Sequence, residues 1–260
     1  MFQYKYTLLL LFVSLLSVSC SNDNNEDDNG TPGIDKTANL QGLGDSAAQL
    51  LSDTEFTSMN IEIVYVNGYA PSQAALENFK NFLEERTFKP DGININLRAI
   101  PSSGKAPFTI EEIVEIEKET RTIYNSGDEI AVYIYVADGK SEKDEENKLT
   151  LGSAFRNTSI VLYGETIEDF ASRPNAPIES DIEAAVLNHE FGHLFGLVDI
   201  GTEPQSDHID EDNAGHCNIP DCLMRASIEF GSGIIDEIEG GRIPQLGSHC
   251  IRDLRAAGGR

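Results

Sequence analysis

Short β-branched segments alternate with amphipathic segments in the first half of the chain. Residues 61–66 (IEIVYV), 93–100 (ININLRAI) and 129–138 (EIAVYIYVAD) are rich in Ile, Val and Tyr, which favours strands. Apolar residues recur at helical spacing over residues 71–86 and 109–124. The order of strand, helix and strand predicts parallel strands joined by a crossover, and the segment 129–138, apolar on both faces, is typical of a central strand.

Two shorter segments, LGSAF and SIVLYG, follow the charged loop GKSEKDEENK. We expect SIVLYG, residues 159–164, to be an edge strand because it is short and polar at its ends. An exposed edge offers backbone donors and acceptors to an extended peptide, which could bind there as an additional strand. The alternative is an edge that a neighbouring loop protects.

A further helix is predicted to contain the sequence HEFGH. Pro177 and the acidic residues that follow it suit a first helical turn, and the next residues give the helix an apolar side. On such a helix His189 and His193 lie one turn apart on the same face, where two imidazole nitrogens can reach one metal ion. Glu190 lies one step round the helix, so its carboxylate can take a proton from a metal-activated water without occupying a coordination position.

The residues after the helix offer several candidates for a third metal ligand. Gly196 can end the helix in a sharp turn at no steric cost, and Asp199 then brings a carboxylate oxygen back toward the metal. An acidic stretch, GTEPQSDHIDEDNAG, contains His208, and His216 follows it directly. Loop spacing favours Asp199, with His208 and His216 as alternatives, although each histidine could also be a solvated loop residue.

The stretch HEFGHLFGLVD, followed later by Met224, resembles the metzincin zinc proteases, whose pattern is H-E-x-x-H-x-x-G-x-x-H and then a methionine turn. Aspartate at the third-ligand position is similar to the snapalysin branch of that family. The sequence HCNIPDCLM at 216–224 resembles the H-C-x-x-x-x-C-x-M run of archaemetzincins. The resemblance implies an α/β (α+β) fold: a twisted mixed sheet with an antiparallel edge strand, an active-site helix and a small irregular C-terminal lobe.

The resemblance also implies a zinc-dependent endopeptidase with one catalytic Zn²⁺. Its metal ligands would be His189, His193 and Asp199, Glu190 would be the general base, and Met224 would lie under the metal. We expect a protein or peptide substrate and a monomer. Two other classes stay open: a surface lipoprotein whose zinc is structural, which a fourth protein ligand would indicate, and an amidase acting on cell-wall peptide.

The N-terminus is typical of an exported protein. In residues 1–19, predicted as a signal peptide, a lysine precedes an apolar run that is too short to cross a bilayer. Cys20 resembles the lipid-accepting cysteine of bacterial lipoproteins. Residues 20–55 are rich in Asn, Asp and Gly near their start and are predicted to be a lipid-anchored flexible acidic tether. We expect an outer-membrane lipoprotein on the periplasmic or cell-surface side, with membrane contact through the N-terminal lipid only.

The remainder, residues 56–260, is predicted to be one protease domain, with an upper lobe to about residue 196 and a lower lobe after it. The net charge of −25 argues against nucleic acid and anionic lipid as partners, because both would be repelled. Cys217, Cys222 and Cys250 are disulfide candidates in an exported protein, and their odd number leaves one over. Which of them pair is open, and a second, structural zinc is an alternative.

Overall fold

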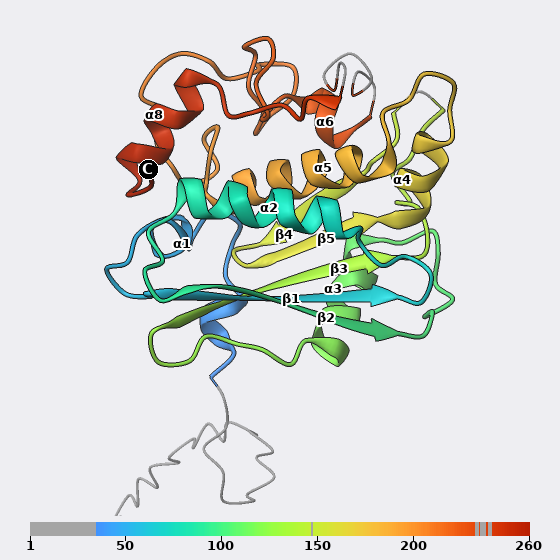
Figure 1. Ribbon diagram of the computed structural model, residues 1–260, viewed down its shortest axis with the longest axis horizontal. Coiled ribbons are helices and arrows are strands. Elements are labelled where there is room, and N and C mark those ends of the chain that lie inside the picture. The colour runs from blue at the N-terminus through green and yellow to red at the C-terminus, as the bar shows by residue number, and fades with distance from the viewer. Residues whose placement is uncertain (1–34, 147, 232–233, 235–237, 239–240) are drawn as a thin grey trace, which may run out of the picture. The chain divides into compact units, whose positions relative to one another are not determined.

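The computed structural model describes residues 35–146, 148–231, 234, 238 and 241–260. Five strands form one sheet in the order β2-β1-β3-β5-β4 (Figure 1). Neighbouring strands are parallel except for β4, which runs antiparallel to β5 at the edge. The predicted α/β fold with an antiparallel edge strand is therefore confirmed. The strands are β1 (Ser58–Val66), β2 (Gly92–Ile100), β3 (Glu129–Ala137), β4 (Gly152–Arg156) and β5 (Ser159–Tyr163).

Helices cover both faces of the sheet. In Figure 1, α2, α4 and α5 lie on one face and α3 lies on the other, while α6 and α8 lie beyond α5, away from the sheet. None of the described helices has the length and apolar character needed to span a membrane. The helices are η1 (Thr37–Asn39), α1 (Ala47–Leu51), α2 (Gln73–Arg86), α3 (Ile110–Thr120), α4 (Gly164–Ala171), α5 (Glu179–Leu194), α6 (Ala226–Glu229) and α8 (Ser248–Ala256).

The alternation of side chains along β3 divides the core into two layers. Ile130, Val132 and Ile134 point into the larger layer, with residues of α2 and α5. Tyr133 and Tyr135 point into the smaller layer, with residues of α3. Since both faces of this strand are buried, its sequence is apolar almost throughout, as predicted for a central strand.

The edge of the sheet is β4 and not β5. The prediction that SIVLYG forms the edge is wrong, because the chain turns back at Asn157 and Thr158 and places β4 outside β5. All five residues of β5 are buried, whereas four of the five residues of β4 are partly exposed. The apolar run of β5 is thus the signature of an interior strand.

Residues 35–55 belong to the folded unit. Leu50 and Leu51 of α1 are fully buried in the larger core layer, and the Asn39 amide donates a hydrogen bond of 3.0 Å to the Ala131 carbonyl of β3. The prediction of a flexible tether up to residue 55 is therefore wrong from residue 35 onward. The predicted signal peptide, Cys20 and the first part of the tether lie outside the described residues.

Candidate metal centre

Helix α5 is enclosed from both sides. It contacts α2 through the Phe191 and Phe79 rings, whose centroids are 5.4 Å apart, and it also contacts β4. A helix enclosed in this way can be apolar all round, and α5 has buried residues on every side. His189 and Glu190 are consequently 0% exposed and His193 is 5% exposed, so the polar groups of the HEFGH sequence lie in a dry environment.

Gly196 ends this segment in a left-handed conformation, with φ of +71°. A Cβ at this position would lie 2.8 Å from the Ile200 carbonyl oxygen, so a larger residue would have to displace the backbone. Two non-glycine residues that follow, Val198 and Asp199, also have positive φ, of 59° and 66°. The chain therefore leaves the helix through a series of tight turns, and Asp199 is exposed at their surface.

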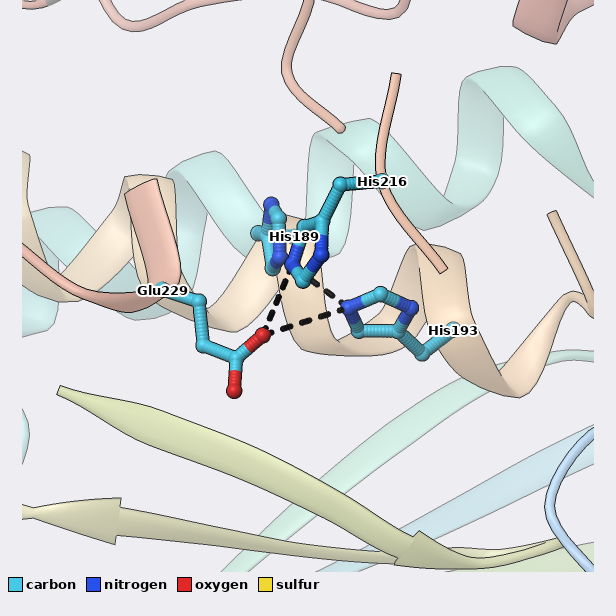
Figure 2. Close-up of side chains that lie close together, drawn as sticks. All are labelled: His189, His193, His216 and Glu229. Carbon is cyan, nitrogen blue, oxygen red and sulfur yellow. Dashed lines mark hydrogen bonds and ion pairs between the residues drawn. The ribbon is translucent and has the colours of Figure 1, made fainter. Parts of the chain in front are cut away.

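His216 is the residue that joins the two histidines of α5. The Nε2 atoms of His189 and His193 are 3.0 Å apart, and the His216 ring lies 5.3 Å from the His189 ring and 5.2 Å from the His193 ring, centroid to centroid. Figure 2 shows that His216 comes from a separate loop and turns toward the α5 histidines. Residues from two distant parts of the sequence thus meet at one point.

Glu229, the last residue of α6, completes the group (Figure 2). Its Oε2 atom lies 2.7 Å from His216 Nε2 and 3.9 Å from His193 Nε2. One ligand atom from each of the four residues lies within 4.8 Å of the others. Four ligand atoms about 2.0–2.1 Å from one tetrahedral zinc ion would be about 3.3 Å apart, so these separations fit such an ion.

His189 directs an unprotonated nitrogen at the centre of the group. His189 Nδ1 lies 2.7 Å from the Leu223 carbonyl oxygen, which can only accept, so Nδ1 carries the proton and Nε2 is free for a metal. Burial, followed by the charge on His216, lowers the pKa of His189 to about 4. Burial also holds the pKa of His193 well below its usual range. Neutral imidazoles are the form that binds a metal.

Glu190 lies beside the group and is held by the edge strand. Its Oε2 atom accepts a hydrogen bond of 2.8 Å from the Ala154 N–H of β4. Its Oε1 atom is buried and has no hydrogen-bond partner among the described residues. Burial, followed by the Glu229 carboxylate, raises the pKa of Glu190 well above its usual range. Gly152 leaves room for this side chain, because a Cβ there would lie 3.0 Å from both Cγ and Oε1 of Glu190.

Met224 lies against the turn of α5 between the two histidines. It is fully buried, and a Cβ on Gly192 would lie 2.3 Å from its sulfur. The Cys217 N–H donates a hydrogen bond of 2.7 Å to the Met224 carbonyl, which fixes the return of the chain under the helix. Met224 is thus buried against the residue that lies between the two α5 histidines, and its sulfur occupies the space that a side chain on Gly192 would fill.

The other two third-ligand candidates lie elsewhere. Asp199 is exposed and is not part of the group, so the preference for Asp199 that loop spacing suggested gives way to His216. His208 belongs to a second buried group, in which its ligand nitrogen and the sulfurs of Cys217 and Cys250 lie within 4.8 Å of one another. Of the three candidates, His216 therefore lies in the histidine group, His208 lies beside the thiols, and Asp199 lies at the surface.

All three remaining cysteines are buried free thiols that no disulfide joins. Cys217 and Cys250 belong to the second group, and Cys222 lies beside it. The Cys222 sulfur lies 3.6 Å from the Cys250 sulfur. The hydrogen bond from Cys217, followed by that from Cys250, lowers the pKa of the Cys222 thiol. His208 Nδ1 faces the Ser206 carbonyl at 2.9 Å, which leaves Nε2 as its ligand atom. Three cysteines and one histidine are a donor set of structural zinc sites.

Two functional candidates escaped the sequence analysis. Glu229 follows Met224 by five residues in RASIEF, a segment with no motif, and only the fold brings it to the histidines. Asp253, whose Oδ2 atom lies 3.1 Å from His208 Nε2, is also new, and both side chains are fully buried. The sequence did contain a hint of Asp253, because it follows Cys250 by three residues and so lies on the same face of α8.

Comparisons with known proteins show a shared fold. No protein-family model matches the chain, and no curated protein does. Among solved structures, archaemetzincin (amzA) from Methanopyrus kandleri is similar, with a TM-score of 0.50 and 16% sequence identity. The alignment covers 77% of this chain and 96% of that chain. The fold expected from the resemblance of the HEFGH and HCNIPDCLM sequences is thus found in the structure.

Proposed function

We propose that this protein is a zinc-dependent endopeptidase. The observation that supports this most is the buried group of His189, His193 and His216, with Glu190 held next to it by the edge strand. The separations of the three imidazoles, and the lowered pKa values of His189 and His193, fit Zn²⁺. The fold that the chain shares with archaemetzincin supports the same activity.

Each residue of the proposed centre has a separate task. The three histidines hold the metal, and the Leu223 carbonyl orients the His189 ring. When bound, zinc would polarise a peptide carbonyl and lower the pKa of a coordinated water to about 7. Glu190 is the general base: the Ala154 N–H fixes its Oε2, and Oε1 takes the proton from water and passes it to the leaving amine.

The free edge of β4 is where an extended peptide would bind. Because β4 is the outer strand of the sheet and contacts α5, a peptide paired with it would lie close to the metal centre. The Ala154 N–H is already bound to Glu190, so pairing would use the other backbone groups of the strand. This proposal transfers to β4 the role that the sequence suggested for residues 159–164.

We propose a structural metal site at the second group, in addition to the catalytic one. His208, Cys217 and Cys250 would supply its ligands, Cys222 adjoins them as a fourth candidate, and Asp253 Oδ2 lies 3.1 Å from His208 Nε2. This proposal is supported by the three free thiols, which are buried close to one another. A metal ion can bind such a cluster as thiolates, whereas packing of an apolar core does not require cysteines to be clustered.

The peptidase proposal is tested with the purified full-length protein. We expect stoichiometric zinc and cleavage of a peptide library, and Glu190→Gln should keep zinc and thermal stability while cleavage falls by about 10²- to 10⁴-fold. Glu179→Gln is the matched control, since Glu179 is an exposed glutamate on the first turn of the same helix. Undiminished cleavage by Glu190→Gln, or a wild-type protein without zinc, would contradict the proposal.

A binding lipoprotein with a purely structural metal is the second candidate. One observation favours it, namely that Glu229 stands beside the histidines as a fourth protein ligand. A purely structural metal site does not explain Glu190, a buried carboxylate with one oxygen that has no hydrogen-bond partner among the described residues. Zinc binding with no cleavage of proteins, peptides or peptidoglycan fragments would support the second candidate, whereas cleavage of peptidoglycan fragments alone would indicate an amidase.

We also propose export and lipid attachment at Cys20, supported by the sequence of the leader. The proposed location is the outer membrane, with the folded unit held off the bilayer. Metabolic labelling with a fatty acid should mark the wild-type protein but not Cys20→Ala, and equal labelling of both would contradict the proposal.

A further inference from the structure

Glu229 occupies a special position relative to the three histidines. Its Oε2 atom is 2.7 Å from His216 Nε2 and 3.9 Å from His193 Nε2, which are separations expected of two ligands on one tetrahedral ion. In Figure 2 the Glu229 carboxylate is directed at the histidine rings. A catalytic zinc site keeps that fourth position for water or substrate, whereas here a side chain points into it.

The contact between Glu229 and His216 calls for a cation. His216 Nδ1 faces the Ala214 carbonyl at 3.2 Å, which assigns the ring proton to Nδ1 and leaves a lone pair on Nε2. A lone pair and a carboxylate oxygen 2.7 Å apart need a cation between them, which is either a proton or a metal ion. A metal ion at the centre of the group would take the place of that proton, and it would also replace the hydrogen bond that joins the Nε2 atoms of the two α5 imidazoles at 3.0 Å.

Glu229 lies beside a cavity that is large enough to accommodate its carboxylate in another rotamer. Its side chain is 15% exposed and lines a cavity of about 440 Å³, together with Ser141, Tyr163 and Phe230. Its backbone is fixed, because the Leu151 N–H donates a hydrogen bond of 2.8 Å to the Glu229 carbonyl. The carboxylate can therefore turn into the cavity by side-chain rotation while the helix stays in place.

We propose that Glu229 is a displaceable fourth ligand: in the resting protein it closes the metal centre, and it moves into the adjoining cavity when substrate binds. This inference rests on the proposed metal centre and adds control of access to it. Other ligands are then excluded from the metal until a peptide carbonyl or another oxygen donor displaces the Glu229 carboxylate from the fourth coordination position.

The experiment measures access to the metal without measuring cleavage. The full-length protein is stripped of metal, loaded with Co²⁺, and titrated with azide while the visible absorption spectrum is recorded. In the wild type we expect azide to change the spectrum only at a concentration at least about 10-fold higher than in Glu229→Ala. Zinc affinity should also fall by about 10- to 100-fold in Glu229→Ala.

Two further variants keep the test specific. Glu145→Gln removes a carboxylate from the rim of the same cavity and should titrate like the wild type, which excludes a general effect of charge. Glu229→Asp keeps the charge but shortens the side chain, so it should open the centre as Glu229→Ala does, and it replaces Glu229→Ala if that variant does not fold. Thermal denaturation establishes that each variant is folded.

The outcomes separate the two proposals. If the wild type and Glu229→Ala bind azide and zinc equally well, the Glu229 inference is overturned and the metal centre stands. If the wild type takes up no Co²⁺ and no zinc at the three histidines, the metal centre fails and the Glu229 inference fails with it. A low-affinity azide response in the wild type that becomes strong in both Glu229 variants supports the inference.

Discussion

A Cβ atom on Gly192 would lie 2.3 Å from the sulfur of Met224, so the absence of a side chain at residue 192 is what lets the methionine pack under α5. Both residues adjoin the candidate metal centre: Gly192 lies between the α5 histidines in sequence, and Met224 follows Leu223, whose carbonyl accepts a hydrogen bond from His189. The pair therefore connects the helix to the loop that carries the third histidine.

Gly192→Ala is expected to destabilise the protein and loosen the metal centre. The added methyl group must push the buried Met224 side chain aside, and overpacking of this kind costs about 1–3 kcal/mol of the free energy of unfolding. Thermal and urea denaturation measure the stability, and competition with a chelator measures zinc affinity. In the double variant Gly192→Ala/Met224→Ala the loss should be smaller than the sum of the two single losses, and strict additivity would contradict this packing.

His216→Ala and Asp199→Asn decide the identity of the third ligand. His216→Ala should lower zinc affinity by more than about 100-fold, because even changes outside the ligands themselves cost 10- to 100-fold. Asp199→Asn should keep wild-type affinity, and asparagine tolerates the positive φ of this residue. Zinc content after dialysis against a weak chelator checks both. The reverse result would return the role to Asp199.

Cys250→Ser is expected to remove one of two metal ions. The wild type should contain two zinc ions per chain, one at each buried group, and the variant should contain about one. Loss of a structural metal should also lower the midpoint of thermal unfolding. His249→Ala is the control, since His249 precedes Cys250 but bonds to Ser206 instead of joining the thiols. An unchanged metal content in Cys250→Ser would contradict the second site.

Arg121→Met tests the buried ion pair that Arg121 forms with Glu117 of α3. Arg121 Nη1 lies 2.8 Å from Glu117 Oε1, and both side chains are almost completely buried, so the substitution leaves Glu117 without its main counter-charge. Breaking a buried pair from one side costs about 3–5 kcal/mol. Lys118→Met, in an exposed pair with Glu115 on the same helix, should change stability by less than about 0.5 kcal/mol. Urea denaturation measures both, and equal losses would contradict this account.

Local pattern was sufficient to predict the main elements of the sheet. The segments 61–66, 93–100 and 129–138 lie in β1, β2 and β3, and the two predicted helices between them correspond to α2 and α3. The apolar residues of each segment recur with the period of a helix or of a strand, because each element buries one or both of its faces. The order of β4 and β5 depends on which way a turn folds, and residue type alone does not fix that.

Of the candidate metal centre, only the residues that lie on one helix could be predicted from the sequence. His189, Glu190 and His193 lie within two helical turns, so their relative positions follow from helix geometry. The third histidine comes from beyond a long insertion whose path depends on tight turns at Val198 and Asp199. Those turns direct Asp199 to solvent, which spacing along the sequence does not reveal.

The first residues of the folded unit show a different limit. Residues 21–30 carry no apolar side chain, and the predicted tether extends beyond the part of the chain that has this composition. Leu50 and Leu51 are two adjacent apolar residues without a long periodic pattern, yet both are completely buried. A short helix of five residues gives too little periodicity for sequence analysis to detect.

His216 and Cys217 are consecutive in the chain, yet one belongs to the histidine group and the other to the thiol group. One planar peptide unit separates the two residues, so a displacement of the Cys217 backbone also displaces the backbone that carries the neighbouring imidazole. We expect oxidation of the thiols, which touches none of the proposed catalytic residues, to displace the loop that carries His216. The redox state of the cysteines would then affect metal binding at a group that contains no cysteine.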